Sequence, residues 1–285
     1  MIDKLIYDPS ARQLASTLLW VMASASILCF IVSELARNYS QVDKLWSIMP
    51  SVYAGIAAIH QPSPRIFVML ILTLVWGFRL SYNFSRKGGY NIVPWKGEED
   101  YRWKIMREVP ALKGRIRFGI FNLLFISFYQ HFLILLFSTP VLLAAENTAK
   151  PLNYIDFIAV AFMAASILLE TVSDNQLFRF HQVKKQGQGT NGVYAESLKS
   201  GFIREGLWKK VRHPNYLGEQ ATWISFYLFS IAASGKILNW TFAGSVLLVL
   251  LFYGSSTLAE KISISKYPDY LGYKKKAGRY FPKIF

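Results

Sequence analysis

Long apolar segments alternate with polar connections along the chain, and this alternation is the strongest pattern in the sequence. A helix needs about 20 mostly apolar residues to cross a bilayer, and most of the segments approach or exceed that length. The second and the sixth are shorter, so we expect them to tilt little or to lie partly at the interface. The pattern predicts an all-α, polytopic integral membrane protein with about seven transmembrane helices: 14–36, 45–59, 66–82, 118–145, 152–170, 217–233 and 237–258.

Basic residues are concentrated in alternate connections between these segments. Of the 32 Lys and Arg residues, 26 fall in the connections 37–44, 86–117 and 179–212 and in the tail from residue 261. Connections rich in Lys and Arg stay on the cytosolic side of a membrane. We therefore expect the N-terminus outside and the C-terminus in the cytosol. The long loops then share the cytosolic face, where nucleotide cofactors are found.

The composition agrees with this picture and narrows the classes of function. The 285 residues are 53% hydrophobic and 16% aromatic, with a mean hydropathy of +0.25, which is too apolar for an ordinary soluble domain. The net charge of +15 does not indicate a nucleic-acid partner, because the basic residues are not gathered into one stripe. A single cysteine, Cys29, excludes an internal disulfide and a thiolate metal site, and no metal site is predicted. Residues 1–13 carry no cleavable signal pattern.

Residues 206–219 form the densest group of chemically useful side chains, directly before an apolar segment. Pro214 fits the first turn of a helix, where its missing N–H costs nothing. That helix would begin near Pro214 and end around Ala233. Its free N–H groups would then lie beside Arg212 and His213, an arrangement that attracts phosphate.

Three polar residues share one face of this predicted helix. Asn215 and Glu219 are four residues apart, and Tyr216 and Glu219 are three apart. A carboxylate one turn inside a membrane helix is costly without a partner. We therefore expect Glu219 to be hydrogen-bonded to Tyr216, Asn215 or a neighbouring helix.

A second group of polar residues lies at the end of the fifth segment. Glu170 and Asp174 are one helical turn apart, and Gln176 and Arg179 follow in the next turn. Two stacked carboxylates repel each other unless a base or the hydroxyl and amide groups of a ligand lie between them. The alternative is a polar helix end that water caps. The glycines of 184–190 form neither a Rossmann nor a P-loop fingerprint, so helices would have to build any nucleotide site here.

Other polar residues allow two interpretations each. Asp43 suits a helix cap as well as a functional role. A lone histidine in a membrane helix is more often structural than a ligand, so we expect His131 to be satisfied within the bundle. The tail combines Tyr270 and Tyr273 with the lysines 274–276. It would either bind anionic lipid or close over an adenine or a phosphate.

The segment Gly206-Leu-Trp, followed by Arg212-His-Pro-Asn-Tyr-Leu-Gly-Glu219, resembles the C-terminal signature of the steroid 5-alpha-reductase and sterol-reductase superfamily, most closely its bacterial-type branch. Isoprenylcysteine carboxyl methyltransferases and phospholipid methyltransferases carry a similar Arg-His-Pro-x-Tyr element. The upstream Glu-x-x-x-Asp-x-Gln block favours the reductases. Supporting blocks occur in the right order over residues 40–285: Asp43 with Trp46, Trp76-Gly-x-Arg79-Leu, Gly97-Glu-x-Asp100-x-Arg102, Glu170 with Asp174 and Gln176, and Tyr270-x-x-Tyr273 before Phe281-Pro.

The resemblance implies a single membrane domain over residues 1–285 with a lipid-accessible pocket. Residues 14–145 would form the substrate side, and residues 146–285 would form the cofactor-binding part. NADPH would enter from the cytosolic face against the last helices, with Glu219 orienting the nicotinamide or its neighbours. The residues that would line NADPH are Asp174, Gln176, Arg179, Arg212, His213, Asn215, Tyr216, Tyr270 and Tyr273.

The implied reaction is reduction of a carbon–carbon double bond in a lipophilic substrate, in a bacterial inner membrane or the endoplasmic reticulum. That chemistry needs little more than a hydride for the β-carbon and a hydrogen-bond donor at the substrate carbonyl. Tyr82, supported by Asp43 or Glu34, is the predicted donor. The early Glu–Tyr pair of steroid-reducing members does not align here, so the substrate class stays at lipophilic enones and unsaturated lipids.

Two other functions remain open, together with the oligomeric state. One is an S-adenosylmethionine-dependent methyltransferase that acts on prenyl or lipid substrates. The other is a non-catalytic membrane protein on the same fold. Arg212→Ala is expected to abolish cofactor binding with little change in thermal stability, which would separate an enzyme from a scaffold.

Overall fold

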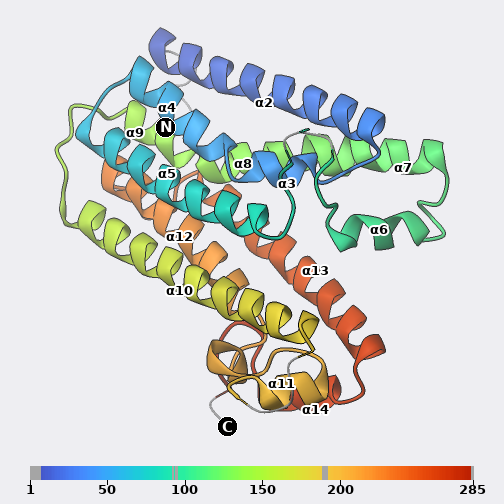
Figure 1. The fold of residues 1–285 in the computed structure, drawn as a ribbon. Helices are drawn as coiled ribbons and strands as arrows, with labels where there is room; N and C mark the ends of the chain where they lie inside the picture. The colour runs from blue at the N-terminus through green and yellow to red at the C-terminus, as the bar shows by residue number, and fades with distance from the viewer. Residues whose placement is uncertain (1–7, 92, 94–95, 188–191, 284–285) are drawn as a thin grey trace. The chain divides into compact units, whose positions relative to one another are not determined.

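The computed structural model describes residues 8–91, 93, 96–187 and 192–283, and these residues form helices and turns without a strand (Figure 1). The all-α prediction is confirmed. The α-helices are α2 (Pro9–Ala36), α3 (Gln41–Trp46), α4 (Met49–His60), α5 (Pro64–Ser85), α6 (Tyr101–Glu108), α7 (Arg115–Phe121), α8 (Gln130–Ser138), α9 (Pro140–Ala145), α10 (Tyr154–Lys185), α11 (Ala195–Ser200), α12 (Pro214–Ser234), α13 (Phe242–Lys266) and α14 (Tyr270–Lys276). A π-helix, η1, covers Asn122–Tyr129, and a 3₁₀-helix, η2, covers Gly206–Lys209.

Five helices or continuous helical runs in the described residues are long and apolar enough to cross a membrane. They are α2, α5, the run Arg115–Ala145, α10 and α13. Two predicted segments are not among them. The second is interrupted between Trp46 and Met49, so that α4 has only 12 residues. The sixth corresponds to α12, whose 21 residues include several polar ones. The count of seven crossings and the orientation therefore stay predictions.

The long helices expose large apolar side chains. On α2, Trp20 is 74% exposed and Leu35 is 81% exposed, and on α5 Phe78 is 77% exposed. Similar side chains are exposed along α10 and α13. Apolar surface of this extent is rare on soluble monomers and is typical of a surface that contacts lipid. The protein is therefore integral to a membrane.

The chain forms two compact units. Unit 1 comprises Met1–Ala159 and Phe226–Ser245, and unit 2 comprises Val160–Ser225 and Val246–Phe285. Three helices, α10, α12 and α13, contribute residues to both units. All of the residues predicted to bind a cofactor lie in unit 2.

A buried ion pair joins α5 to α10 within unit 1. Arg65 Nε donates to Asp156 Oδ1 at 2.7 Å, and Arg65 Nη2 donates to Asp156 Oδ2 at 2.9 Å. Both side chains are only 2% exposed. Both side chains also form hydrogen bonds with the backbone. Arg65 donates to the carbonyl of Pro151 at 2.8 Å, and Asn153 N donates to Asp156 at 2.9 Å. The pair fixes the first turns of the two helices to each other.

The connection after α5 returns to the turn between α2 and α3, also within unit 1. Asn38 Nδ2 donates to the carbonyl of Gly97 at 2.6 Å, and Asp100 N donates to Ser40 Oγ at 2.8 Å. Trp103 Nε1 donates to Asp43 Oδ2 at 3.0 Å. The Gly97-Glu-x-Asp100-x-Arg102 block therefore has a structural role, because it holds this connection against the start of α3.

Candidate functional site

The turn that precedes α12 is held in place by α10, within unit 2. Gly206 has φ +61°, a conformation that favours glycine, and a Cβ there would lie 2.6 Å from Gln176 Oε1. Gln176 Oε1 accepts from Leu207 N at 3.0 Å, and Trp208 Nε1 donates to the carbonyl of Ser173 at 3.2 Å. Gln176, predicted to contact a cofactor, thus uses its amide oxygen to position this turn.

The segment that follows the turn pairs with the C-terminal tail. Arg212 N donates to the carbonyl of Gly278 at 2.8 Å, and His213 N donates to the carbonyl of Arg279 at 3.1 Å. An isolated parallel bridge joins Val211 to Gly278. Pro214 then starts α12, which confirms the predicted helix start. The pairing fixes the backbone of Arg212 and His213, and therefore the positions from which their side chains extend.

A buried carboxylate, Glu260 of α13, lies within 4 Å of four basic side chains. Arg212 Nε lies 2.8 Å and His213 Nε2 3.2 Å from Glu260 Oε1, and Lys274 Nζ lies 2.9 Å from Oε2. Arg279 Nε is 3.9 Å from Oε1. Glu260 is 1% exposed, whereas Lys274 is 39% and Arg279 22% exposed. We call these five residues the Glu260 cluster.

The Glu260 cluster carries more positive than negative charge. Its three permanent cations, Arg212, Lys274 and Arg279, face a single carboxylate within 4 Å. Arg212 also donates through Nη1 to the carbonyls of Ala277 and, at 3.3 Å, Lys274. Two positive charges therefore remain uncompensated within the cluster, beside the N-terminus of α12. Such a place is suited to an anion.

His213 is held neutral by its surroundings. Burial lowers the pKa of His213, although the hydrogen bond to Glu260 opposes that shift. The unfolded chain would then bind a proton near pH 6.5 that the folded chain does not bind until a lower pH. Stability from this group is therefore present above about pH 6.5 and decreases as the pH falls below that value.

We expect a melting temperature that falls between pH 7 and pH 5.5 and a smaller fall in His213→Gln. Thermal unfolding of purified protein over this pH range measures the difference. The exposed His60 provides the matched control, because His60→Gln should keep the wild-type profile. Identical profiles for wild type and His213→Gln would contradict the buried neutral histidine.

Aromatic and amide groups line the start of α12. The rings of His213 and Tyr216 stack with centroids 5.2 Å apart at an interplanar angle of 17°, and Phe252 packs edge-on against Tyr216. Asn215 Nδ2 donates to Asp174 Oδ1 at 3.3 Å. Asn215 Oδ1 is buried and accepts no hydrogen bond from the described residues. Within unit 2 the structure thus brings together Asp174, Asn215, Tyr216 and the Glu260 cluster.

Glu219 lies one turn further along α12. It is 4% exposed, and its Oε1 accepts from Trp223 Nε1 at 3.1 Å. The carboxylate therefore has a hydrogen-bond partner, as expected, but this partner lies on its own helix and had not been predicted. Next to it, Gly218 allows α12 to approach α10, because a Cβ there would lie 2.8 Å from Glu170 Cβ and 3.0 Å from Glu170 N.

We expect Gly218→Ala to lower the free energy of unfolding by about 1–3 kcal/mol, because the added methyl group would overlap the backbone of α10. Gly254→Ala is the matched control. It adds the same group to α13 where no atom of a neighbouring helix lies within 4 Å, and a helical Gly-to-Ala change there should be neutral or stabilising by up to about 1 kcal/mol. Chemical denaturation in detergent micelles compares the two, and equal effects would contradict the close approach.

The two tail tyrosines are structural. Tyr270 and Tyr273 are each 5% exposed and pack with Phe202. The Tyr273 hydroxyl donates to the carbonyl of Trp208 and lies 3.4 Å from that of Val211, and burial raises its pKa. This bond joins α14 to the turn before α12. Arg179 differs from the other predicted residues of unit 2, because its side chain is exposed.

The predicted hydrogen-bond donor, Tyr82, is not paired with either of the acids proposed to support it. Tyr82 is 59% exposed and lies under the guanidinium of Arg86, which is 5.5 Å from its ring centroid. Asp43 accepts from Trp103, and Arg102 Nη2 is 3.4 Å away. Glu34 accepts from Asn122 at 2.9 Å. Among the described residues no hydrogen bond joins Tyr82 to either acid, because each acid has a partner from another part of unit 1.

Sequence reasoning missed the residue at the centre of the site. Glu260 is a carboxylate within the apolar helix α13, and an ionisable residue in a membrane helix is itself a signal of a partner or a function. Lys274 and Arg279 belong to a basic tail that could equally be solvated. The described residues contain no group of three or more His, Cys, Asp or Glu side chains that could hold a metal ion.

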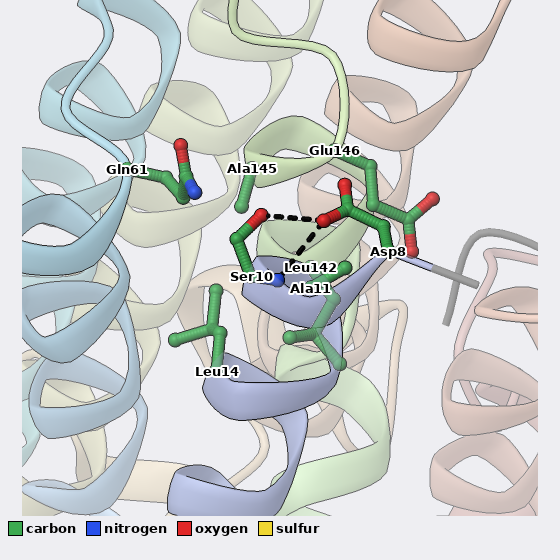
Figure 2. Close-up of a pocket in the computed structure, with 8 residues that line it drawn as sticks. All are labelled: Asp8, Ser10, Ala11, Leu14, Gln61, Leu142, Ala145 and Glu146. Atoms are coloured by element: carbon green, nitrogen blue, oxygen red, sulfur yellow. Dashed lines mark hydrogen bonds between the residues drawn. The ribbon is translucent and has the colours of Figure 1, made fainter. Parts of the chain in front are cut away.

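A hollow in unit 1 contains none of the predicted site residues. Figure 2 shows its lining at the start of α2, where Asp8 Oδ1 accepts from the backbone N and the hydroxyl of Ser10 at 2.9 Å and 2.7 Å. These bonds cap α2. The lining residues are Asp8, Ser10, Ala11, Leu14, Gln61, Leu142, Ala145 and Glu146.

Comparisons with known proteins extend over most of the chain. The family described as "Protein of unknown function (DUF1295)" matches residues 29–277. The chain is 35% identical over 266 residues to the "Uncharacterized protein C594.04c" of Schizosaccharomyces pombe (strain 972). That alignment covers 89% of this chain and 75% of the fungal protein. No solved structure matches. The matched region includes the Glu260 cluster except Arg279.

Proposed function

We propose, for a chain that belongs to the family described as "Protein of unknown function (DUF1295)", that unit 2 binds NADPH and that the protein reduces a carbon–carbon double bond of a lipophilic substrate. The proposal extends the resemblance of residues 206–219 to the steroid 5-alpha-reductase and sterol-reductase superfamily. It includes seven membrane crossings, an outside N-terminus and a cofactor site on the cytosolic face. The membrane would be a bacterial inner membrane or the endoplasmic reticulum.

The observation that carries the proposal is the uncompensated positive charge of the Glu260 cluster. Arg212 is already bound to Glu260 and to two carbonyls, so Lys274 and Arg279, which are partly exposed, would contact phosphate oxygens directly. Arg212 and Glu260 would hold the cluster in shape. Charged hydrogen bonds of this kind are among the strongest that proteins offer to phosphate.

The neighbouring groups suit the rest of a dinucleotide. Asp174 accepts hydrogen bonds, as ribose hydroxyls require, and the buried Asn215 Oδ1 is an acceptor for a hydroxyl or a carboxamide N–H. The stacked rings of His213 and Tyr216 form a planar surface. Glu219, held by Trp223, would orient the nicotinamide or its neighbours.

Bound NADPH would supply a hydride to the β-carbon of a polarised alkene. A hydrogen-bond donor at the substrate carbonyl would stabilise the negative charge that develops there, and a proton from solvent would then add to the α-carbon to complete the reduction. Tyr82, which is 59% exposed, remains the predicted donor.

One observation favours a non-catalytic protein instead. Arg212, Gln176 and Tyr273, which resemble cofactor contacts in the sequence, each bind protein groups that hold unit 2 together. The burial of Arg212 also changes the expectation for Arg212→Ala, which should now destabilise the protein as well as weaken binding. The partly exposed Lys274 and Arg279 are therefore better positions for testing the site.

The test is binding of NADPH, NADH and S-adenosylmethionine to the purified full chain, compared by thermal shift at matched concentrations. We expect NADPH to raise the melting temperature, by an amount that grows with its concentration. Stabilisation by S-adenosylmethionine alone would replace the reductase by a methyltransferase. Stabilisation by none of the three would favour the non-catalytic protein.

A further inference from the structure

A second group of buried polar side chains lies in unit 1, where α2, η1, α8 and α4 pack against one another. α2 and the run Arg115–Ala145, which includes η1 and α8, are long and apolar enough to cross a membrane. Hydrocarbon offers no hydrogen bonds, so polar groups at that depth need partners of their own. The polar residues with at most 2% exposure in these helices include Cys29, Ser33, Tyr53, Asn122, Ser127 and His131.

The helical run that carries three of these residues departs from α geometry. Asn122–Tyr129 form a π-helix, a rare geometry that occurs frequently at functional sites. Ser127 Oγ donates to Asn122 Oδ1 at 3.3 Å, and Asn122 Nδ2 donates to Glu34 at 2.9 Å. These bonds tie the π-helix to α2.

His131 follows the π-helix and has one ring nitrogen engaged. Its Nδ1 lies 2.6 Å from the carbonyl of Ser127. A carbonyl only accepts, so Nδ1 carries the proton and Nε2 of the neutral ring is an acceptor. Nε2 is buried, and it forms no hydrogen bond with the described residues. The ring therefore presents a fixed acceptor to a donor from elsewhere.

Tyr53, on the neighbouring helix α4, also carries a buried polar atom, its hydroxyl oxygen. The side chain is 0% exposed, and its hydroxyl is buried without a hydrogen-bond partner among the described residues. Tyrosine hydroxyls usually find a partner when they are buried. α4 and α8 pack directly against each other, so the acceptor of His131 and the hydroxyl of Tyr53 belong to adjoining helices.

We infer that unit 1 binds the hydroxyl group of a lipophilic alcohol between α4 and α8. The ligand hydroxyl donates to His131 Nε2 and accepts from the hydroxyl of Tyr53. A ketone or an ether does not satisfy His131, because neither has a hydrogen to donate. We expect the hydrocarbon part of the ligand to pack against apolar side chains of the same helical run. Three of these are fully buried: Ile126, Leu133 and Ile134. This inference is independent of the NADPH proposal, which concerns unit 2.

The test compares 1-octanol with heptyl methyl ether, two isomers of which only the alcohol has a donor. The full chain is labelled with ¹⁵N-histidine and placed in nanodiscs of phosphatidylcholine, a lipid without hydroxyl groups. We expect 1-octanol to shift the Nε2 resonance of His131 in a saturable way and the ether to leave it unchanged. Equal shifts with both isomers, or no shift with either, would overturn the inference. His131→Gln identifies the resonance.

Tyr53→Phe removes one oxygen and tests the second contact. We expect it to weaken 1-octanol binding by about three- to tenfold, the range for loss of one neutral hydrogen bond. Tyr154→Phe, on a side chain that is 74% exposed in the same unit, is the matched control and should bind like wild type. Equal affinities in wild type and Tyr53→Phe would remove Tyr53 from the site. The comparison of the two isomers uses the wild-type chain. It therefore still tests the inference if the Tyr53 variant does not fold.

Discussion

Replacing Glu260 with alanine is expected to lower the free energy of unfolding by about 3–5 kcal/mol, the range for breaking a buried ion pair by removing one partner. The Glu260 side chain is 1% exposed and that of Arg212 is 6% exposed. Among the described residues, Arg212 would then keep its bonds to the carbonyls of Lys274 and Ala277 but no carboxylate partner. A buried charge without a counter-charge is costly, and the remaining cations of the cluster would repel one another. Chemical denaturation of purified protein in detergent micelles measures the loss.

Two further variants separate the causes of that loss. Glu260→Gln keeps the shape and one acceptor of the side chain, so its effect should lie between those of wild type and Glu260→Ala. Glu196 is the matched control in unit 2, because it is 75% exposed and its nearest ion-pair contact, with Arg204, is 3.8 Å. Glu196→Ala should change stability by no more than about 0.5 kcal/mol. A Glu260→Ala effect as small as that of Glu196→Ala would show that Glu260 does not organise the cluster.

Asp156→Ala is expected to be similarly destabilising in unit 1, again by about 3–5 kcal/mol. Its carboxylate accepts both hydrogen bonds of the Arg65 fork and one from Asn153 N. Removal would leave the guanidinium, 2% exposed, without its counter-charge. Arg65→Lys should cost less than Asp156→Ala, because it keeps a charge and loses the bidentate geometry.

A double variant distinguishes the ion pair from two independent losses. Arg65→Met combined with Asp156→Leu replaces both charges by apolar groups, which is often nearly neutral for a buried pair. We therefore expect the double variant to be more stable than either single variant, Asp156→Leu or Arg65→Met. Unfolding free energies that add for the two sites would contradict the pairing, because partners in contact are not additive.

The helices were predictable because their signals are local. The apolar segments and Pro214 are properties of neighbouring residues, and the start of α12 follows from them. The interruption at Ser47–Ile48 was not predictable in this way. Apolar residues continue across it from Leu45 to Ile59, so hydropathy alone gives a single segment where the chain forms α3 and α4.

The site was predictable only in part because its geometry depends on contacts between distant residues. Asp174 and Asn215 meet although they are 41 residues apart, and Arg212 meets Glu260 across 48 residues. Sequence spacing identified Arg212 and Asn215 by their motif but contained no information on Glu260 as their neighbour. Gln176 and Tyr273 resembled ligand contacts, but the structure uses them to hold the turn before α12.

Calorimetric titration of NADPH into wild type, Lys274→Met and Lys275→Met tests most directly the proposal that the Glu260 cluster holds NADPH. Lys274 Nζ lies 2.9 Å from Glu260, whereas Lys275 is exposed on the same helix. The two variants therefore remove the same charge from adjacent positions. We expect Lys274→Met to weaken binding by about tenfold, as for loss of a hydrogen bond to a charged group, and Lys275→Met to bind within about twofold of wild type. Equal affinities for the two variants, or no binding by wild type, would contradict the claim.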